Sequence, residues 1–211
     1  MTLCLNDLAI YKPDGEVLLS NFNLTIKPGQ ITCLMGPSGC GKSSLLNVIA
    51  GHVSEGFRYQ GKVQLDDQEI GSMDAHLRRV GILFQDDLLF PHLTVWQNLA
   101  FALPNEIKGE ARKRRAIEAL TEVSLNELAN SYPERISGGQ RARISLLRML
   151  LAKPKLALLD EPFSKLDATL RSQFREWVFL QLQQAHIPAL LVTHDAHDAP
   201  NGGEIIQWPQ N

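Results

Sequence analysis

The segment that most constrains the fold of this chain covers residues 31–51 and reads ITCLMGPSGCGKSSLLNVIAG. It begins with apolar residues typical of a strand buried on both faces, and it ends with a helix-like run that stops at Gly51. Between them, residues 36–43 match the pattern G-x-x-x-x-G-K-S/T in full. Strand, glycine-rich loop and helix in this order predict a phosphate-binding loop rather than a chance glycine-rich turn.

The residue types of this loop suit the binding of a triphosphate. Its glycines let the backbone curl so that successive N–H groups face one centre, and the N-terminus of the following helix adds partial positive charge. Lys42 can reach the β- and γ-phosphates, and the Ser43 hydroxyl can ligate Mg²⁺. The residues expected to hold a nucleotide here are Gly36, Pro37, Ser38, Gly39, Cys40, Gly41, Lys42, Ser43 and Ser44.

Composition narrows the class of protein. The 211 residues are 44% hydrophobic and 21% charged, as in an ordinary globular protein, and the net charge of −2 gives no electrostatic case for a nucleic-acid partner. Cys4, Cys33 and Cys40 lack the spacing of disulfides or zinc sites, which favours a cytosolic protein. No signal sequence or membrane-spanning run is visible, so a role in transport would require a separate membrane partner.

The hydrophobic pattern predicts an α/β fold with a parallel sheet, an antiparallel β part and a helical insertion. Residues 2–30 alternate as in an antiparallel sheet, and buried strands are expected at residues 80–84, 156–159 and 188–193. A long helix is expected at residues 166–184. Three more helices are expected near residues 95–103, 109–123 and 138–152. We therefore expect a single domain, with its core and β subdomain in residues 1–85 and 156–211 and its helical subdomain in residues 86–155.

Polar side chains follow several of the expected strands. Because parallel strands end at one edge of a sheet, these side chains and the phosphate loop can converge there. Asp160 is suited to holding Mg²⁺, and Glu161 to polarising an attacking water. Gln85 can orient that water or complete the metal shell, and His194 can contact the γ-phosphate. Acidic residues also simply begin loops, so the prediction rests on their joint placement.

Three features leave alternatives open at this point. Tyr11, at the end of the first expected strand, could stack on an adenine ring or could lie on the face of a sheet. The basic run at residues 112–115 could meet an anionic partner, although the acidic net charge favours the solvated face of an amphipathic helix. The His194-Asp195 pair resembles a metal-binding dyad, but the upstream histidines of such sites are missing.

A second glycine-rich segment opens the helix expected near residues 138–152. Residues 136–140 read ISGGQ, which by itself predicts another anion-binding helix terminus. The pentapeptide resembles the LSGGQ signature of ABC-type ATPases, and the resemblance covers nearly the whole chain. GPSGCGKS, Gln85, ISGGQRARISLLRMLLAKPKLALLDEPFSKLD and THD occur in the order and spacing of that family. The stretch LLFPHLTVWQNLAFAL makes the chain most similar to ATP-binding subunits of importers for small solutes.

This resemblance implies a P-loop NTPase core of the RecA-like type that binds ATP and Mg²⁺ and hydrolyses ATP. Such subunits work as head-to-tail homodimers, with each ATP held between the phosphate loop of one chain and the signature of the other. The signature residues Ser137, Gly138, Gly139 and Gln140 would therefore act on the partner's nucleotide. The resemblance also favours adenine stacking for Tyr11.

Partners and location follow from the same resemblance. The segment from Gln85 to about Asn98 would form a groove for a short helix of an integral membrane permease, and a solute-binding protein could join the assembly. The chain would then be cytoplasmic and peripheral, on the inner face of the cell membrane. ATP binding would close the dimer, and hydrolysis with product release would reopen it.

Two departures and several rival functions remain. Ile136 replaces the usual leucine, and Lys165 replaces the usual small residue in the loop 164–167 that links the two sites of the dimer. The chain ends shortly after His194, so we expect no ligand-sensing appendage. The rivals are an ABC-type ATPase in DNA repair, on ribosomes or in lipid or lipoprotein export, and a small-metabolite kinase, which the signature disfavours. Neither the solute nor the direction of transport follows from the residues.

Overall fold

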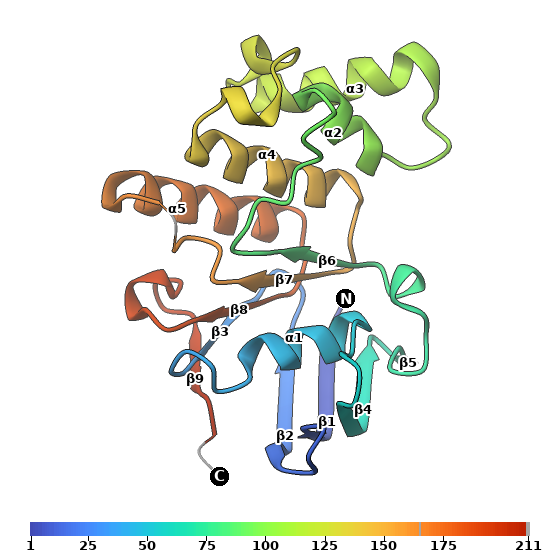
Figure 1. Cartoon of the computed structure of the whole chain (residues 1–211), viewed down its shortest axis with the longest axis vertical. Coiled ribbons are helices and arrows are strands. Elements are labelled where there is room, and N and C mark those ends of the chain that lie inside the picture. Colours follow the sequence, from blue (N-terminus) through green and yellow to red (C-terminus); the bar gives the residue numbers. More distant parts are fainter. Residues whose placement is uncertain (165, 210–211) are drawn as a thin grey trace. The chain divides into compact units, whose positions relative to one another are not determined.

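A computed structural model describes residues 1–164 and 166–209 (Figure 1). The chain divides into two compact units, and each is described by itself. The first unit comprises Met1–Ile82, Lys155–Glu161 and Arg175–Asn211. The second comprises Leu83–Pro154 and Pro162–Phe174, so it takes in a segment beyond the range 86–155 expected for a helical insertion.

An antiparallel sheet forms one layer of the first unit. Its strands are β1 (Leu3–Tyr11), β2 (Val17–Ile26), β4 (Arg58–Leu65) and β5 (Gln68–Glu69), in the order β2-β1-β4-β5. β1 pairs with both β2 and β4, and its alternating residues Leu3, Leu5, Leu8 and Ile10 are buried. The antiparallel sheet expected from the alternation in residues 2–30 is therefore confirmed.

A five-stranded sheet forms the second layer of the first unit, and the candidate site residues follow the C-terminal ends of its strands. Its strands are β6 (Val80–Leu83), β7 (Leu156–Asp160), β8 (Ala189–Thr193), β3 (Ile31–Met35) and β9 (Glu204–Gln207), in the order β6-β7-β8-β3-β9. β3 pairs in parallel with β8 and β9, and β7 pairs in parallel with β8. The expected buried strands are found in β3, β7 and β8. The strand expected at residues 80–84 is confirmed as β6, but its expected burial is wrong. β6 lies at the sheet edge, and Leu83 is its one fully buried residue.

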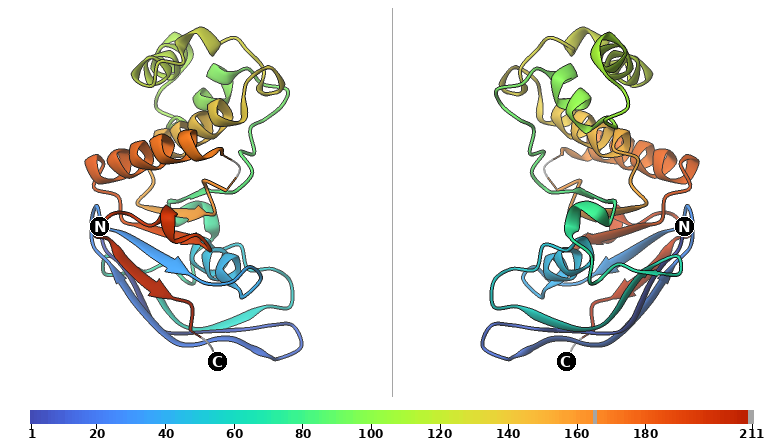
Figure 2. Two further views of the ribbon diagram at one scale, coloured as in Figure 1. Left: turned by 90° about the vertical axis from the view of Figure 1, so that its left-hand side faces the viewer. Right: turned by 90° about the vertical axis from the view of Figure 1, so that its right-hand side faces the viewer.

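Helix α1 (Lys42–Ala50) packs between the two sheets, as both views in Figure 2 show. One hydrophobic cluster joins its residues Leu45 and Ile49 to β1, β3, β7 and β8. The C-terminus of α1 is held by Arg78, which follows the short 3-10 helix η1 (Ala75–Leu77). The buried Arg78 guanidinium donates to the Val48 and Ile49 carbonyls at 2.8 and 3.0 Å, so it satisfies acceptors that a helix terminus leaves free.

The second unit contains the three expected helices. They are α2 (Val95–Ala102), α3 (Gly109–Glu122) and α4 (Gly138–Leu151), with the short 3-10 helices η2 (Asn126–Leu128) and η3 (Pro133–Arg135) between α3 and α4. The Thr94 N–H donates to Gln97 Oε1 at 2.8 Å, as expected of a residue that caps α2. Helix α5 (Ala168–Gln184) begins in this unit and ends in the first, and the 3-10 helix η4 (Ala196–Asp198) follows β8.

The basic run on α3 has two structural roles. Arg112 donates to the carbonyls of Ala100, Pro104 and Ile107 at 2.7, 3.0 and 2.7 Å, so it holds the connection between α2 and α3. Arg114 and Arg115 are exposed and pair with Glu118. The interpretation as a solvated helix face therefore fits these two arginines, whereas the internal role of Arg112 was not visible in the sequence.

Within the described residues, no helix has the length and apolar character needed to span a membrane.

Candidate nucleotide site

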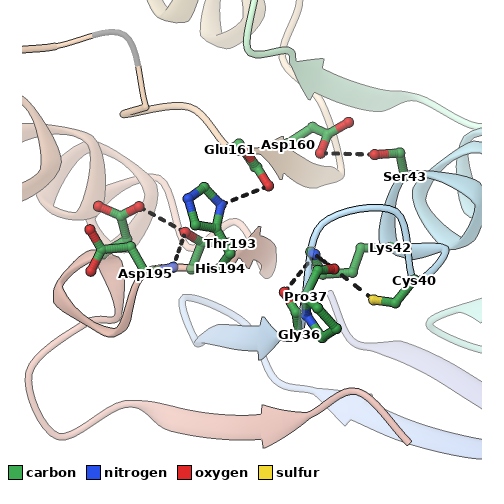
Figure 3. A network of polar contacts seen from close by, with 11 residues as sticks. Gly36, Pro37, Cys40, Lys42, Ser43, Asp160, Glu161, Thr193, His194 and Asp195 are labelled. Atoms are coloured by element: carbon green, nitrogen blue, oxygen red, sulfur yellow. Dashed lines mark hydrogen bonds and ion pairs between the residues drawn. The ribbon is translucent and has the colours of Figure 1, made fainter. Parts of the chain in front are cut away.

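The phosphate loop joins β3 to α1 and curls around the Lys42 side chain (Figure 3). Lys42 is the first residue of α1 and is only 5% exposed. Its Nζ donates to the carbonyl oxygens of Gly36 and Pro37 at 2.8 and 2.7 Å, and it lies 3.9 Å from Cys40 Sγ. The structure thus places the ammonium group inside the loop, at the N-terminus of a helix, where both contributions favour an anion.

The start of the loop is packed against Trp208. A Cβ atom on Gly36 would lie 2.6 Å from Trp208 Cβ, so only glycine fits there. The backbone N–H of Trp208 donates to the Met35 carbonyl at 2.5 Å, and Trp208 is almost fully buried. Sequence reasoning missed this residue, because a single tryptophan beyond the last strand has no motif around it.

Ser43 and Asp160 lie together although they are 117 residues apart in the sequence. The Ser43 hydroxyl donates to Asp160 Oδ1 at 3.2 Å, and Asp160 ends β7. Burial raises the pKa of Asp160 above its usual range, and the neighbouring Glu161 carboxylate raises it further. The hydrogen bond from Ser43 and the charge of Lys42 oppose that shift. A hydroxyl and a partly desolvated carboxylate are oxygen ligands of the kind that Mg²⁺ prefers.

No group of three or more His, Cys, Asp or Glu side chains within residues 1–164 and 166–209 is arranged to hold a metal ion. In phosphoryl-transfer sites, Mg²⁺ is usually held by one or two protein groups together with oxygen atoms of a bound phosphate and of water.

Glu161 and His194 form a second pair at the same sheet edge (Figure 3). His194 Nδ1 lies 3.0 Å from Glu161 Oε1, and Glu161 is the less exposed of the two. Glu161 has φ 45°, a left-handed conformation that costs a non-glycine residue about 1–2 kcal/mol. Its N–H donates to the Val192 carbonyl at 3.0 Å, which holds the turn in this conformation. Backbone strain of this kind is concentrated at functional sites.

The turn that carries His194 is fixed by buried polar groups. The Thr193 hydroxyl donates to Asp198 Oδ2 at 2.8 Å and accepts from the Asp195 N–H at 3.1 Å. Asp195 Oδ1 in turn accepts from the His197 N–H at 2.9 Å. Asp195 is thus committed to local structure, which argues against a His194-Asp195 metal dyad.

Tyr11 ends β1 and lines an open pocket of about 560 Å³ with residues from β4 and the loop before it. Its hydroxyl lies 3.4 Å from Gln60 Oε1. The ring is therefore neither buried in the core nor isolated on a sheet face.

The remaining expected site residues belong to the second unit and lie around the first turn of α4. Ser137 caps the helix: its Oγ accepts from the Gln140 N–H at 3.3 Å, and its N–H donates to Gln140 Oε1 at 2.9 Å. Gly138 and Gly139 form the first turn. Gln85 and Gly138 line one pocket of about 260 Å³ within this unit. Lys165, expected to bear on contacts across a dimer, lies outside the described residues.

The structure thus groups the expected residues in two sets. Lys42, Ser43, Asp160, Glu161 and His194 come together in the first unit. In the second unit, Gln85 and the signature residue Gly138 line one pocket.

Known proteins resemble this chain over most of its length. The sequence pattern of the ABC transporter family matches residues 19–164. The chain is 45% identical to an uncharacterized ABC transporter ATP-binding protein, YnjD, of Escherichia coli (strain K12), over 99% of this chain and 97% of that protein. It is 41% identical to the sulfate/thiosulfate import ATP-binding protein CysA of Pseudomonas aeruginosa, over 86% of this chain. It spans only 56% of the length of that CysA.

A solved structure also resembles this chain. The ATP-binding cassette MJ0796, determined as a dimer in a post-hydrolysis state bound to ADP and Pi, superposes with a TM-score of 0.80 at 32% sequence identity. The match covers 98% of this chain and 94% of that one, and it confirms the expected P-loop NTPase fold. The chain therefore belongs to the ABC transporter family, as one of its ATP-binding and ATP-hydrolysing subunits.

Proposed function

We propose that this subunit energises the movement of a small solute through a separate permease, with its ATP bound as the Mg²⁺ complex. The observation that supports the site most is the convergence in one unit of the phosphate loop with Asp160, Glu161 and His194, which come from two other strand ends. This edge of a parallel sheet is where ligands bind in open α/β folds.

The side chains have distinct roles in this proposal. Lys42 and the loop N–H groups bind the β- and γ-phosphates. Ser43 and Asp160 hold Mg²⁺, which neutralises charge on the phosphate oxygens when bound. Glu161 polarises the attacking water and accepts its proton, and His194, 3.0 Å away, orients that carboxylate and contacts the γ-phosphate. Gln85 orients the attacking water or completes the metal shell.

We also propose that the two units act as one ABC-type ATPase domain that functions as a head-to-tail homodimer. Ser137, Gly138, Gly139 and Gln140 then act on the nucleotide of the partner chain. The N-terminus of the 14-residue helix α4 supports an anion-binding role for them, and the dimeric state of the related cassette MJ0796 supports the assembly.

The direction of transport is the third part of the proposal. The CysA relatives are named as import subunits for sulfate and thiosulfate, so we propose import of a small solute. The permease would dock at residues 85–98, where Leu88 is 54% exposed, and a solute-binding protein would be a further partner. This places the subunit in the cytoplasm, peripherally on the inner face of the cell membrane.

Two measurements test this function. Lys42→Ala should abolish both ATP binding and turnover, whereas Lys62→Ala, a change of an exposed lysine on β4, should affect neither. Normal turnover in Lys42→Ala would overturn the assignment of the phosphate loop. Affinity capture of the tagged chain from detergent-solubilised membranes should recover a multi-span permease, and recovery of ribosomes or DNA in its place would favour a non-transport ABC-type ATPase.

A further inference from the structure

Gly36, the first residue of the phosphate loop, is held by three segments of the first unit. Its N–H donates to the Thr193 carbonyl at 3.4 Å, and its own carbonyl accepts from Lys42 Nζ at 2.8 Å (Figure 3). It also faces Trp208 so closely that an added Cβ atom would lie 2.6 Å from Trp208 Cβ and 3.4 Å from Trp208 Cγ. Thr193 ends β8 and Trp208 follows β9, and these two strands flank β3. The loop therefore begins between the ends of both strands that neighbour β3.

Trp208 is itself firmly placed. Its backbone N–H donates to the Met35 carbonyl, and β9 pairs in parallel with β3. At the start of β9, the Glu204 carboxylate accepts from Gln30 Nε2 at 3.1 Å and from Thr32 Oγ1 at 3.2 Å. Trp208 is 8% exposed and belongs to the hydrophobic cluster of the first unit. The side chain therefore cannot move away from the loop without loosening β9 or the core.

A second side chain supports the other end of the loop. Gly41 has φ 111°, and a Cβ atom there would lie 2.7 Å from Leu18 Cγ. Leu18 lies on β2 and packs against the same hydrophobic cluster as Trp208. The loop thus rests on apolar side chains from two segments outside its own motif. Of the two, Trp208 contacts the residue whose carbonyl binds the Lys42 ammonium group.

This support matters because a glycine-rich backbone has many accessible conformations. A phosphate-binding loop must hold several N–H groups and a lysine ammonium group in one arrangement, and a flexible loop loses conformational entropy when a ligand imposes that arrangement. Packing on Trp208 imposes part of the order during folding instead. A loop without this support would populate the binding arrangement for only part of the time, and its apparent affinity for phosphate would fall by that fraction.

We propose that Trp208 is a positioning residue for the phosphate loop. Through Gly36 it holds the loop backbone and the Lys42 ammonium group in the arrangement that binds the phosphates. The proposal rests on the proposed function, because the ligand is the triphosphate of the nucleotide that the subunit binds. The coupling is reciprocal, so a triphosphate in the loop also changes the surroundings of the Trp208 indole.

The first test measures affinity for ligands with and without a base. Binding of ATP and of inorganic tripolyphosphate to the full chain is followed by isothermal titration calorimetry. Trp208→Ala should weaken both about tenfold and by the same factor, because the change acts on the loop and not on a contact with the base. Trp208→Phe keeps an aromatic ring beside Gly36 and should recover most of the affinity.

Trp177→Ala is the matched control. Trp177 is a half-buried tryptophan on α5 and belongs to the same unit as Trp208. Its replacement should lower thermal stability without changing the affinity for either ligand. A general loss of stability is thereby separated from a loss of loop order.

The second test uses the indole as its own reporter. The chain has three tryptophans, which are Trp96, Trp177 and Trp208. Saturating tripolyphosphate should change the fluorescence emission of the unmodified chain and of Trp177→Phe, and most of that change should be lost in Trp208→Phe. A purely structural role for Trp208 would give neither this signal nor the parallel loss of the two affinities.

Unchanged tripolyphosphate affinity in folded Trp208→Ala would overturn the proposal. So would a fluorescence response that is absent from the unmodified chain or undiminished in Trp208→Phe, and this comparison decides alone if Trp208→Ala does not fold. If Lys42→Ala loses both ligands while the Trp208 variants keep full affinity, the proposed function stands and the role of Trp208 is refuted. If the unmodified chain binds neither ATP nor tripolyphosphate, the proposed function fails, and the role of Trp208 fails with it.

Discussion

The Arg141 guanidinium lies 2.7 Å from the Asp87 carboxylate and so joins the first turn of α4 to the segment that follows Gln85. Other α4 side chains strengthen this link. Ser145 Oγ donates to the Asp87 carbonyl at 2.8 Å, and Arg148 donates to the Leu88 carbonyl at 2.9 Å. The signature and the segment proposed to receive the permease are therefore connected within one unit.

The Asp87–Arg141 pair should contribute measurably to the stability of this connection. Each side chain is about one-third exposed, so we expect a coupling free energy of about 1 kcal/mol from a double-mutant cycle of Asp87→Ala and Arg141→Ala. The exposed pair of Arg114 and Glu118, at 3.8 Å, is the matched control and should couple by about 0.3 kcal/mol. Chemical denaturation measures both, and equal coupling in the two pairs would contradict the prediction.

Glu161→Gln should separate ATP binding from ATP hydrolysis. The amide keeps the shape of the side chain but cannot accept a proton from water, so turnover should fall by at least about a hundredfold while ATP affinity is retained. With hydrolysis blocked, the ATP-bound homodimer should accumulate. Turnover assays and size-exclusion chromatography with ATP check this, and a monomer under those conditions would refute the head-to-tail homodimer.

Gly36→Ala should disrupt the phosphate loop. The new methyl group would lie 2.6 Å from Trp208 Cβ, which cannot move without moving its backbone, so we expect a loss of stability of about 1–3 kcal/mol and greatly weakened ATP binding. Gly138→Ala is the matched control. Its nearest neighbour would be Arg141 Nη2 at 3.8 Å, and alanine is the better helix former, so the fold and ATP binding by the single chain should be unaffected. Thermal denaturation and calorimetric titration distinguish the two outcomes.

The cysteines should differ sharply in reactivity. Burial, with a smaller contribution from Asp198, raises the pKa of the Cys33 thiol from 9.0 to about 12, so it stays protonated and inaccessible in the folded chain at pH 9. Iodoacetamide should therefore label the half-buried Cys40 and spare Cys33, and ATP should slow labelling of Cys40. Mass spectrometry of the labelled peptides measures this.

The same pKa shift has a consequence for stability. The unfolded chain can release the Cys33 proton above pH 9.0 and the folded chain cannot, so this group should lower stability as the pH rises from 9.0 towards 12. Cys33→Ala should remove that part of the pH dependence, and labelling of native Cys33 at pH 9 would contradict the assignment.

Local patterns in the sequence were sufficient to predict most of the helices and strands and the phosphate loop. The phosphate loop, the capped helices α2 and α4 and the strands β3, β7 and β8 follow from periodicity and turn residues within short windows. The edge strand β6 was misjudged, because an apolar run does not distinguish a central strand from an edge strand. That difference depends on which strands pair on either side.

Contacts between residues that are far apart in the sequence could be identified only in the folded chain. The sequence by itself placed candidate site residues after several of the expected strands, and the parallel pairing of the sheet brought Ser43 to Asp160 and Glu161 to His194. It contained no signal for Trp208 against Gly36, for Arg78 at the C-terminus of α1, or for Arg112 at the last turn of α2. The sequence determined the chemistry and the local geometry, because both depend on neighbouring residues. Only the tertiary structure decided which surfaces meet, because packing joins segments that the chain keeps far apart.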